Sequence, residues 1–301
     1  MDDEGLLDLL GYLKRRGYHF HSVTPSTHAR VLARERSAAP TLRDVFGWNR
    51  SFGESEIEAG LLGLMERAGI LERSPQGLRS ALRVASLDND LFFHSAFPTD
   101  EPDAVFFGPD TYRFARFMRE RWPASASRVI DMGAGSGAGG IVAARLAPDA
   151  AVTLVDVNVD ALHLARVNAR AAGVKADLRQ DDAMPSEADV IVANPPYMMD
   201  PGGRAYRDGG GLFGGALALD WTRQALASLA PGGTFLLYAG AAVVDGSAPL
   251  TTALLTACAE AGASCQIEEI DPDVFGEELA QPAYAEVERI AAIGATIRVR
   301  A

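Results

Sequence analysis

Cysteine is almost absent from this chain of 301 residues, which contains only Cys258 and Cys265. The two do not form a CxxC pair matched by a second pair, so the common pattern of a structural zinc site is missing. Small scaffolds that depend on disulfides carry many more cysteines. We therefore expect two reduced, buried thiols, no metal site and a cytoplasmic location.

Long hydrophobic runs are also lacking. No apolar, uncharged stretch of helical character reaches the length that a membrane-spanning helix requires. The N-terminal segment MDDEGLLDLLGYLKRRG places acidic residues before its apolar run, which is the reverse of the order in a secretory signal peptide. Both features predict a protein without a membrane segment.

Basic residues are scarce, because 28 Lys and Arg stand against 40 Asp and Glu, giving a net charge of −12. Residues 1–100 hold 12 basic and 14 acidic side chains, whereas residues 101–301 hold 16 and 26. Binding of duplex nucleic acid normally requires a basic stripe, so a duplex partner is disfavoured. Hydrophobic residues make up 48% of the chain, which suits a full core, and the length suits two domains.

The first 95 residues read as helices followed by strand segments. Helices are expected over 5–16, from Thr24 toward Arg36, over 41–46 and over 54–68, with Gly69 ending the last one. Strand segments with turns at 75–77 and 88–90 follow. This pattern predicts a small winged-helix-like domain over residues 1–95, which either docks a substrate or caps the catalytic domain.

A basic patch in this N-terminal domain is the one feature that would suit nucleic acid. Its spacing is more typical of a solvated helix face. The patch comprises Arg30, Arg34, Arg36 and Arg43.

Residues 96–127 are expected to connect the domains and to include a helix over TYRFARFMRERW. From residue 128 to 301, strands and helices alternate, which predicts a doubly wound α/β domain with a mostly parallel sheet. The last strand is expected to run antiparallel, because no crossover helix is evident in 271–288. Strands are predicted at 128–132, 151–156, 175–179, 189–193, 233–240, 265–270 and 290–300, and helices at 138–147, 159–172, 214–229 and 249–262.

A glycine-rich turn, RVIDMGAGSGAGG, joins the first strand and helix of this domain. Gly133, Gly135 and Gly137 permit positive φ angles and close approach of the backbone to a ligand. The turn alone fits a nicotinamide or flavin enzyme equally well. Asp131 favours another ligand, because its carboxylate would repel a pyrophosphate but attract the ammonium and sulfonium groups of S-adenosylmethionine. Asp156 ends the next strand and can accept both ribose hydroxyls.

The most specific motif is Asn194-Pro195-Pro196-Tyr197, which follows the strand DVIVA. The Asn194 side-chain oxygen and the Pro195 carbonyl can accept the two N–H groups of an amide or amino nitrogen, which aims its lone pair at a methyl donor. The two prolines restrict the backbone and preorganise these acceptors. Tyr197 offers a flat face to a planar group.

These motifs resemble the class I (Rossmann-like) S-adenosylmethionine-dependent methyltransferases with an (Asp/Asn/Ser)-Pro-Pro-aromatic motif. Among these, the chain is most similar to release-factor glutamine N5-methyltransferases and the methyltransferase small-domain family. The resemblance covers residues 105–240 and is carried by FFGPDTYRFARF, DMGAGSGAGG, and NPPY followed by YRDGGGLFGGALALD. It implies that the segment Pro109-Asp110-Thr111 flanks the cofactor pocket. It also implies that Asp182 and Ala183, or the adjacent Asp181, meet the adenine.

The chain departs from these glutamine methyltransferases in three places. Tyr112 stands where they usually have a glutamate after Pro-Asp-Thr, the N-terminal domain looks helical with a hairpin, and the segment 272–290 is long. These departures leave the methyl acceptor open among three classes. The acceptor expected first is a protein glutamine. The alternatives are an exocyclic amino group of RNA or DNA, and an amino acid or secondary metabolite. A degenerate, non-catalytic binding module is disfavoured by the intact motifs.

Two loops are candidates for contacting the acceptor. The glycine-rich segment 200–215 is expected to be a mobile loop that presents Arg204, Tyr206 and Arg207. The long loop 271–288 is expected to cover the acceptor pocket. It carries Phe275, Tyr284 and the acidic pair Glu277 and Glu278, which together could bind a flat or cationic group. We predict Tyr197, Arg204, Tyr206 and Phe275 as substrate-binding residues.

Overall fold

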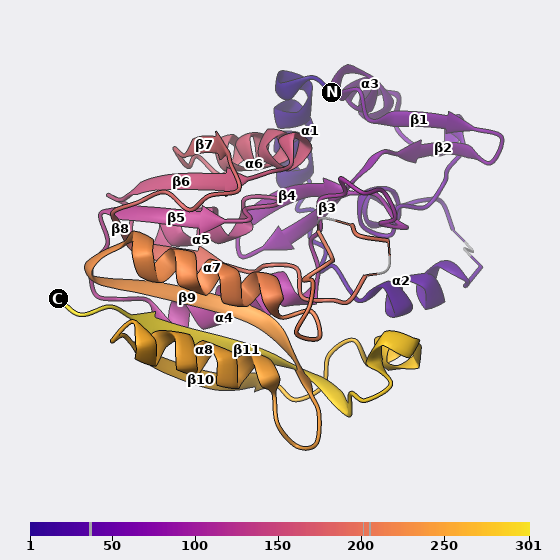
Figure 1. Cartoon of the computed structure of the whole chain (residues 1–301). Helices are drawn as coiled ribbons and strands as arrows, with labels where there is room; N and C mark the ends of the chain where they lie inside the picture. The colour runs from indigo at the N-terminus through magenta and orange to yellow at the C-terminus, as the bar shows by residue number, and fades with distance from the viewer. Residues whose placement is uncertain (36–37, 201, 205) are drawn as a thin grey trace.

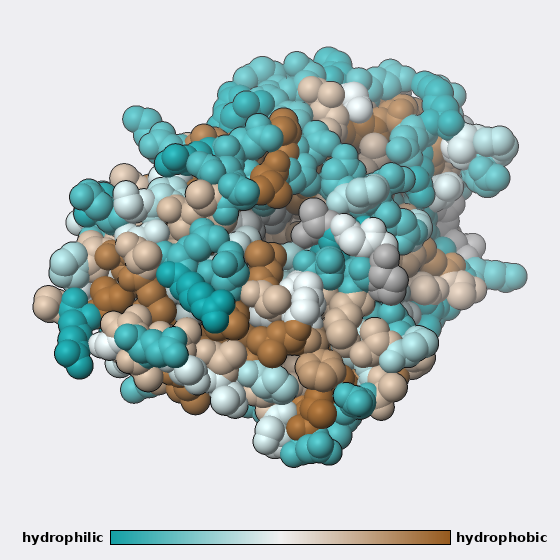
Figure 2. All heavy atoms as spheres, in the orientation of Figure 1, coloured by the Kyte–Doolittle hydropathy of each residue, from teal (hydrophilic) through white to brown (hydrophobic). Residues whose placement is uncertain are grey.

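The computed structural model describes residues 1–35, 38–200, 202–204 and 206–301. An N-terminal part lies against one end of a larger α/β part (Figure 1). On the face shown in Figure 2, hydrophobic residues occur in small patches among hydrophilic ones. Among the described residues, no helix is long and apolar enough to cross a membrane, and no group of three or more metal-ligating side chains comes together.

The N-terminal part consists of helices and two antiparallel hairpins. Its elements are α1 (Asp3–Arg15), α2 (Pro25–Leu32), a π-helical turn (Arg43–Gly47), a 3-10 turn (Glu54–Glu56), α3 (Ala59–Ala68), β1 (Leu71–Ser74), β2 (Gly77–Ser80), β3 (Leu82–Leu87) and β4 (Asp90–Ser95). Strand β1 pairs with β2, and β3 with β4. Helix α3 ends at Gly69, which has the left-handed conformation expected of it.

Three helix predictions in this part need correction. The helix that begins after the Thr24 cap ends at Leu32 and does not run on to the region of Arg36, which itself lies outside the described residues. The helix expected over 41–46 is a single π-helical turn. The helix expected over 54–68 is broken at Ile57, whose φ of −125° and ψ of 160° are extended values.

The second part is built on a seven-stranded sheet with the order β10-β11-β9-β8-β5-β6-β7. Its strands are β5 (Arg128–Met132), β6 (Ala151–Asp156), β7 (Asp177–Gln180), β8 (Ala188–Ala193), β9 (Leu229–Val243), β10 (Ser264–Asp271) and β11 (Arg289–Arg298). Strand β11 runs antiparallel to both β9 and β10, whereas the pairs from β9 to β7 are parallel. The doubly wound sheet and its antiparallel last strand were both predicted correctly.

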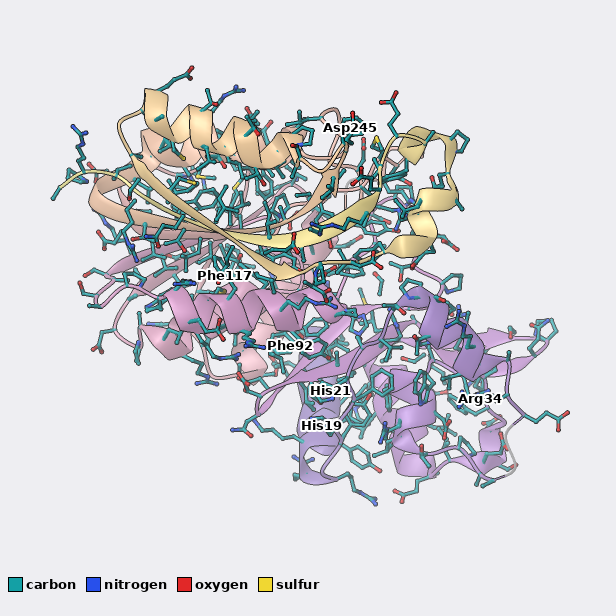
Figure 3. The ribbon with its side chains drawn as sticks, turned by 90° about the horizontal axis from the view of Figure 1, so that it is seen from below. His19, His21, Arg34, Phe92, Phe117 and Asp245 are labelled. Atoms are coloured by element: carbon teal, nitrogen blue, oxygen red, sulfur yellow. The ribbon has the colours of Figure 1, made fainter. Side chains whose placement is uncertain are left out.

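Helices cover both faces of this sheet (Figure 1). They are α4 (Pro109–Arg121), α5 (Ala138–Leu146), α6 (Val159–Ala171), α7 (Ala216–Ser228) and α8 (Pro249–Glu260). In Figure 3, Phe117 lies between α4 and the sheet, and Phe92, a residue of β4, lies on the other side of α4. The Phe117 ring fits against Gly294 of β11, where an added Cβ would come within 2.5 Å of the ring. The glycine is therefore needed for α4 to lie close to the sheet.

The two cysteines are free thiols, as expected. Cys258 on α8 is buried, but Cys265 is only half-buried because β10 is an edge strand of the sheet.

The two parts of the molecule join along α6. Leu164 and Val167 of this helix are buried in the same hydrophobic cluster as the N-terminal helices. Asn168 is fully buried, and its side chain accepts a hydrogen bond from the Phe93 N–H at 2.9 Å and donates one to the Phe93 carbonyl at 3.1 Å. Strand β4 is thereby fixed to the α/β part. A domain boundary at residue 95 remains a prediction.

Candidate active site

A cavity of about 450 Å³ opens at the carboxyl ends of the parallel strands. Ligands of doubly wound sheets bind at this edge, next to the point where the strand order reverses. The cavity is lined by the turns that follow β5, β6, β7 and β8, by the start of α4, and by Phe275 from the loop after β10.

The glycine turn after β5 lies in this cavity as predicted. Gly133, Gly135 and Gly137 have φ values of 68°, 53° and 80°. An added Cβ on Gly133 would lie 2.5 Å from the Trp221 ring, whereas an added Cβ on Gly135 would have no atom within 4 Å. Gly135 therefore leaves open space for a ligand. Gly137 caps α5 and does not line the cavity.

Asp131 is 2% exposed, and its Oδ2 accepts a hydrogen bond from the Gly140 N–H at 2.6 Å. Burial raises the pKa of the Asp131 carboxyl to about 7, against the lowering effect of that hydrogen bond, and the charge of Asp156 adds to the rise. A buried carboxylate of this kind gains much from a cationic ligand, because its charge is poorly solvated in the free protein. The residue therefore suits the ammonium group predicted for this place.

Asp156 is held by the backbone on both oxygens. Its Oδ2 accepts from the Gly135 N–H at 2.8 Å, and its Oδ1 accepts from the Asn158 N–H at 2.9 Å. Burial raises the pKa of this carboxyl above its ordinary value. Each carboxylate oxygen has a further lone pair, so both can still accept from ligand hydroxyls.

The turn after β7 places Asp181 and Asp182 on the cavity wall, whereas Ala183 is exposed and lies outside it. Asp181 already accepts from the Ala183 N–H at 3.1 Å and from the Arg179 Nε at 3.0 Å. Either aspartate remains a candidate for the adenine contact.

The ionisable side chains that line the cavity are mostly acidic. Among the described residues that line it, six are aspartates and one, Arg207, is basic. Arg207 is itself paired with Glu278 at 2.5 Å. This balance opposes a pyrophosphate and favours a cationic ligand. The six are Asp110, Asp131, Asp156, Asp181, Asp182 and Asp220.

Asn194, Pro195, Pro196 and Tyr197 line the same cavity directly after β8. Asn194 is half-buried. Its side chain and the Pro195 carbonyl make no hydrogen bond to any residue that the structure describes. Two acceptors on a proline-restricted backbone are thus free to bind the same ligand group.

Tyr197 is held more firmly than a free stacking face would be. It is 7% exposed, and its hydroxyl donates to the Asp110 Oδ2 at 2.7 Å. Its ring packs against Gly240, where an added Cβ would lie 2.1 Å from Cδ2, and meets the Phe275 ring edge-on at 6.0 Å. Little of the ring is therefore exposed for stacking against a ligand, and the stacking role of Tyr197 remains a prediction.

The two loops predicted to meet the acceptor contact each other. Tyr206, Arg207 and Phe275 line the cavity, and the Arg207–Glu278 pair joins the two loops. Arg204 does not line it, because its guanidinium is bound to Asp200 at 2.6 Å. Mobility of 200–215 stays a prediction, and Pro201 and Ala205 lie outside the described residues.

Two residues of the segment Pro109-Asp110-Thr111, which was predicted to flank the cofactor pocket, line the cavity. They are Asp110, which is 2% exposed, and Thr111, which is 7% exposed. Phe106 and Trp221 also line the cavity, although neither was predicted as a site residue. Phe106 begins the motif FFGPDTYRFARF, which could have indicated it, whereas Trp221 lies just beyond the motif that ends at Asp220.

Comparison with known proteins assigns the middle of the chain. Residues 113–241 match the model of the methyltransferase small domain family. The release factor glutamine methyltransferase of Neisseria gonorrhoeae is 37% identical over 106 residues, which cover 33% of this chain and 38% of that protein. That of Koribacter versatilis is 30% identical over 161 residues, covering 48% and 58%. The ribosomal protein uL3 glutamine methyltransferase of Bordetella pertussis is 40% identical over 124 residues, covering 37% and 41%.

The chain thus spans between about two fifths and three fifths of the length of these relatives. Among solved structures, wild-type Trm5b from Pyrococcus abyssi has a similar fold, with a TM-score of 0.50 and 16% identity over 77% of this chain and 62% of that one. Residues 113–241, which make up less than half of the chain, are thus similar to the methyltransferase small domain, and the seven-stranded, mostly parallel sheet is similar in fold to that of Trm5b.

Proposed function

We propose that the protein is an S-adenosylmethionine-dependent N-methyltransferase whose acceptor is the side-chain amide of a protein glutamine. One observation carries the proposal: the Asn194 side chain and the Pro195 carbonyl both lack a hydrogen-bond partner among the described residues, and both belong to residues that line the acidic cavity. An amide or amino nitrogen with two N–H groups satisfies two such acceptors at once.

The cofactor half of the cavity would hold S-adenosylmethionine through the glycine turn and its carboxylates. Asp131 would face the ammonium group, Asp156 the ribose hydroxyls, and Asp181 or Asp182 the adenine. Thr111 lines the cavity beside them. When bound, the cofactor supplies an electrophilic methyl group on its sulfonium.

The acceptor half would orient the amide nitrogen. Its two hydrogens point at Asn194 Oδ1 and the Pro195 carbonyl, which turns the nitrogen lone pair toward the methyl group. A nitrogen–carbon bond forms as the carbon–sulfur bond breaks, and the electron pair of that bond stays on sulfur. The nitrogen then carries an acidic proton, which passes to water, so no strong base is required. Orientation of the reacting atoms supplies much of the rate.

The choice of a protein glutamine is supported by the relatives, which are named for glutamine methylation of release factors and of ribosomal protein uL3. It also agrees with the acidic charge of the chain, which disfavours a nucleic-acid acceptor.

The test is methyl transfer from S-adenosylmethionine carrying an isotope-labelled methyl group. A bacterial release factor and ribosomal protein uL3 serve as acceptors, with total RNA as a parallel acceptor and Asn194→Ala as the matched control. We expect label on a glutamine of one of the proteins, recovered as methylamine after acid hydrolysis. Label in RNA alone would show that the acceptor is a nucleobase and not a glutamine. Equal incorporation of label by Asn194→Ala would show that Asn194 has no role in the transfer.

A further inference from the structure

A buried carboxylate at the start of α4 joins the wall of the cavity to elements behind it. Asp110 is 2% exposed. Its Oδ2 accepts from the Tyr197 hydroxyl at 2.7 Å, and its Oδ1 accepts from the Tyr238 hydroxyl at 2.7 Å and from Arg113 Nη1 at 3.3 Å. Arg113 in turn binds the Asp271 Oδ2 at 2.8 Å. One network thus links α4, the segment after β8, strand β9 and the end of β10.

Both oxygens of Asp110 accept hydrogen bonds from side chains of the protein. A buried carboxylate without such donors would be strongly unfavourable, and the donors in turn fix its position. Asp110 is therefore placed to hold the Tyr197 hydroxyl.

Tyr197 is the last residue of the motif Asn194-Pro195-Pro196-Tyr197. The first residue, Asn194, follows Ala193, which pairs within the sheet as the last residue of β8. Pro195 and Pro196, between the two ends, have restricted φ angles. Fixing the Tyr197 ring by its hydroxyl and against Gly240 therefore limits the directions in which the Pro195 carbonyl and the Asn194 side chain can point.

We propose that Asp110 is a positioning residue for methyl transfer, acting through the Tyr197 hydroxyl on Asn194 and Pro195. The inference rests on the proposed function, since it concerns the same two acceptors. It assigns the Tyr197 hydroxyl an anchoring role that is separate from any contact of its ring with the acceptor.

Tyr238 provides a matched control. Both tyrosine hydroxyls are buried, and both donate to Asp110 at 2.7 Å, but Tyr238 lies on β9 and does not line the cavity. In Tyr238→Phe, Arg113 still binds the Asp110 Oδ1, and the Tyr197 anchor is kept. The two phenylalanine variants thus remove the same kind of hydrogen bond, one attached to the motif and the other to the sheet.

The experiment compares Tyr197→Phe, Tyr238→Phe and Asp110→Asn in kcat, acceptor KM, cofactor affinity and thermal stability, on an acceptor that the wild type methylates. We expect Tyr197→Phe and Asp110→Asn to lower kcat by roughly 10- to 100-fold, the cost of misplacing reacting groups by about 1 Å. Cofactor affinity should change by less than about twofold in Tyr197→Phe and Tyr238→Phe, because neither variant removes a carboxylate from the cavity. Tyr238→Phe should lose similar stability but keep kcat within about threefold. An equal fall in kcat for both tyrosine variants would overturn the proposal, since the network would then be only structural.

A second readout does not depend on the acceptor. The side-chain NH₂ resonances of Asn194, assigned by their absence in Asn194→Ala, should shift or broaden in Tyr197→Phe and stay unchanged in Tyr238→Phe. Unchanged resonances in Tyr197→Phe would contradict the positioning role even if no glutamine substrate is found. Altered resonances together with a failure to methylate any protein would leave the positioning role standing and remove only the proposed acceptor.

Discussion

The two halves of the cavity are built in different ways. The cofactor half is made of short segments that follow β5, β6 and β7, and its carboxylates are held largely by neighbouring backbone N–H groups. Gly140 binds Asp131, and Gly135 binds Asp156. The acceptor half is made of side chains from segments far apart in the sequence. Tyr197 binds Asp110, 87 residues away, and Arg207 binds Glu278.

This difference implies that the halves can be disturbed separately. These backbone N–H groups belong to the turn after β5 and to helix α5, so the cofactor half should tolerate changes in the loops 200–215 and 271–288. The acceptor half depends on individual side-chain contacts, so single substitutions there should alter transfer or acceptor choice without changing cofactor affinity. The predictions that follow test this separation.

The largest effect is expected for Asn194→Ala. Loss of one preorganised polar contact to the reacting group should lower kcat by about 10² to 10³-fold. Affinity for S-adenosylhomocysteine, measured by calorimetry, should remain close to that of the wild type. A large loss of affinity would show that the halves are not separate, and normal turnover would show that the motif is only a turn.

Asp156→Ala should act on the cofactor half alone. It leaves the Gly135 and Asn158 N–H groups without their acceptor and removes the partner of the ribose hydroxyls. Cofactor binding should weaken by roughly 1–3 kcal/mol, the range for leaving buried polar groups unpaired. At saturating cofactor, the acceptor KM should be unchanged. A change in acceptor KM of the same size would argue for one continuous site.

The pH dependence of cofactor binding should report on Asp131, whose pKa is raised by burial from 3.8 to about 7. Between these values the folded protein holds a proton that the unfolded chain has released, so the unfolding free energy of the free protein falls as pH rises through this window. Binding of an ammonium group requires the ionised carboxylate. Cofactor affinity should therefore rise by up to about tenfold per pH unit below pH 7 and level off above it.

Calorimetry over this pH range, in buffers of different ionisation enthalpy, would also detect the proton released on binding. In Asp131→Asn the affinity should be lower and should no longer vary with pH in this window. A wild-type affinity that is flat between pH 5 and pH 8 would place the titrating group elsewhere.

The smallest effect on the cofactor half is expected from deletion of residues 276–282. This segment includes Glu278, the partner of Arg207, and follows Phe275 on the cavity wall. The ratio of turnover between the release factor and uL3 should change by severalfold, on the order of the effect of a lost pocket contact. Cofactor affinity should not change. If acceptor preference is also unaffected, acceptor choice must come from the N-terminal part and residues up to 112.

The residues predicted for the cofactor half could be chosen from the sequence because most of their signals are local. Asp131 and the glycines lie within a few residues of one another, and the strand that precedes them is recognisable from its apolar run. The parallel direction of most strands follows from the alternation of strands and helices. The antiparallel last strand follows from the missing crossover helix.

The acceptor half is less predictable because its contacts are non-local. The pairing of Arg204 with Asp200 keeps this arginine away from the cavity, although its loop was identified correctly. The buried position of the Tyr197 hydroxyl depends on Asp110 and Gly240, and no spacing in the sequence links these residues. The breaks in the N-terminal helices likewise depend on packing, which overrides local propensity.

The most direct test of the account is titration calorimetry of the wild-type protein with S-adenosylmethionine and, separately, with NADH. The acidic cavity predicts one S-adenosylmethionine bound per chain and no measurable heat from NADH under the same conditions. Binding of NADH without binding of S-adenosylmethionine would contradict the assignment of the glycine turn and of the carboxylates around it.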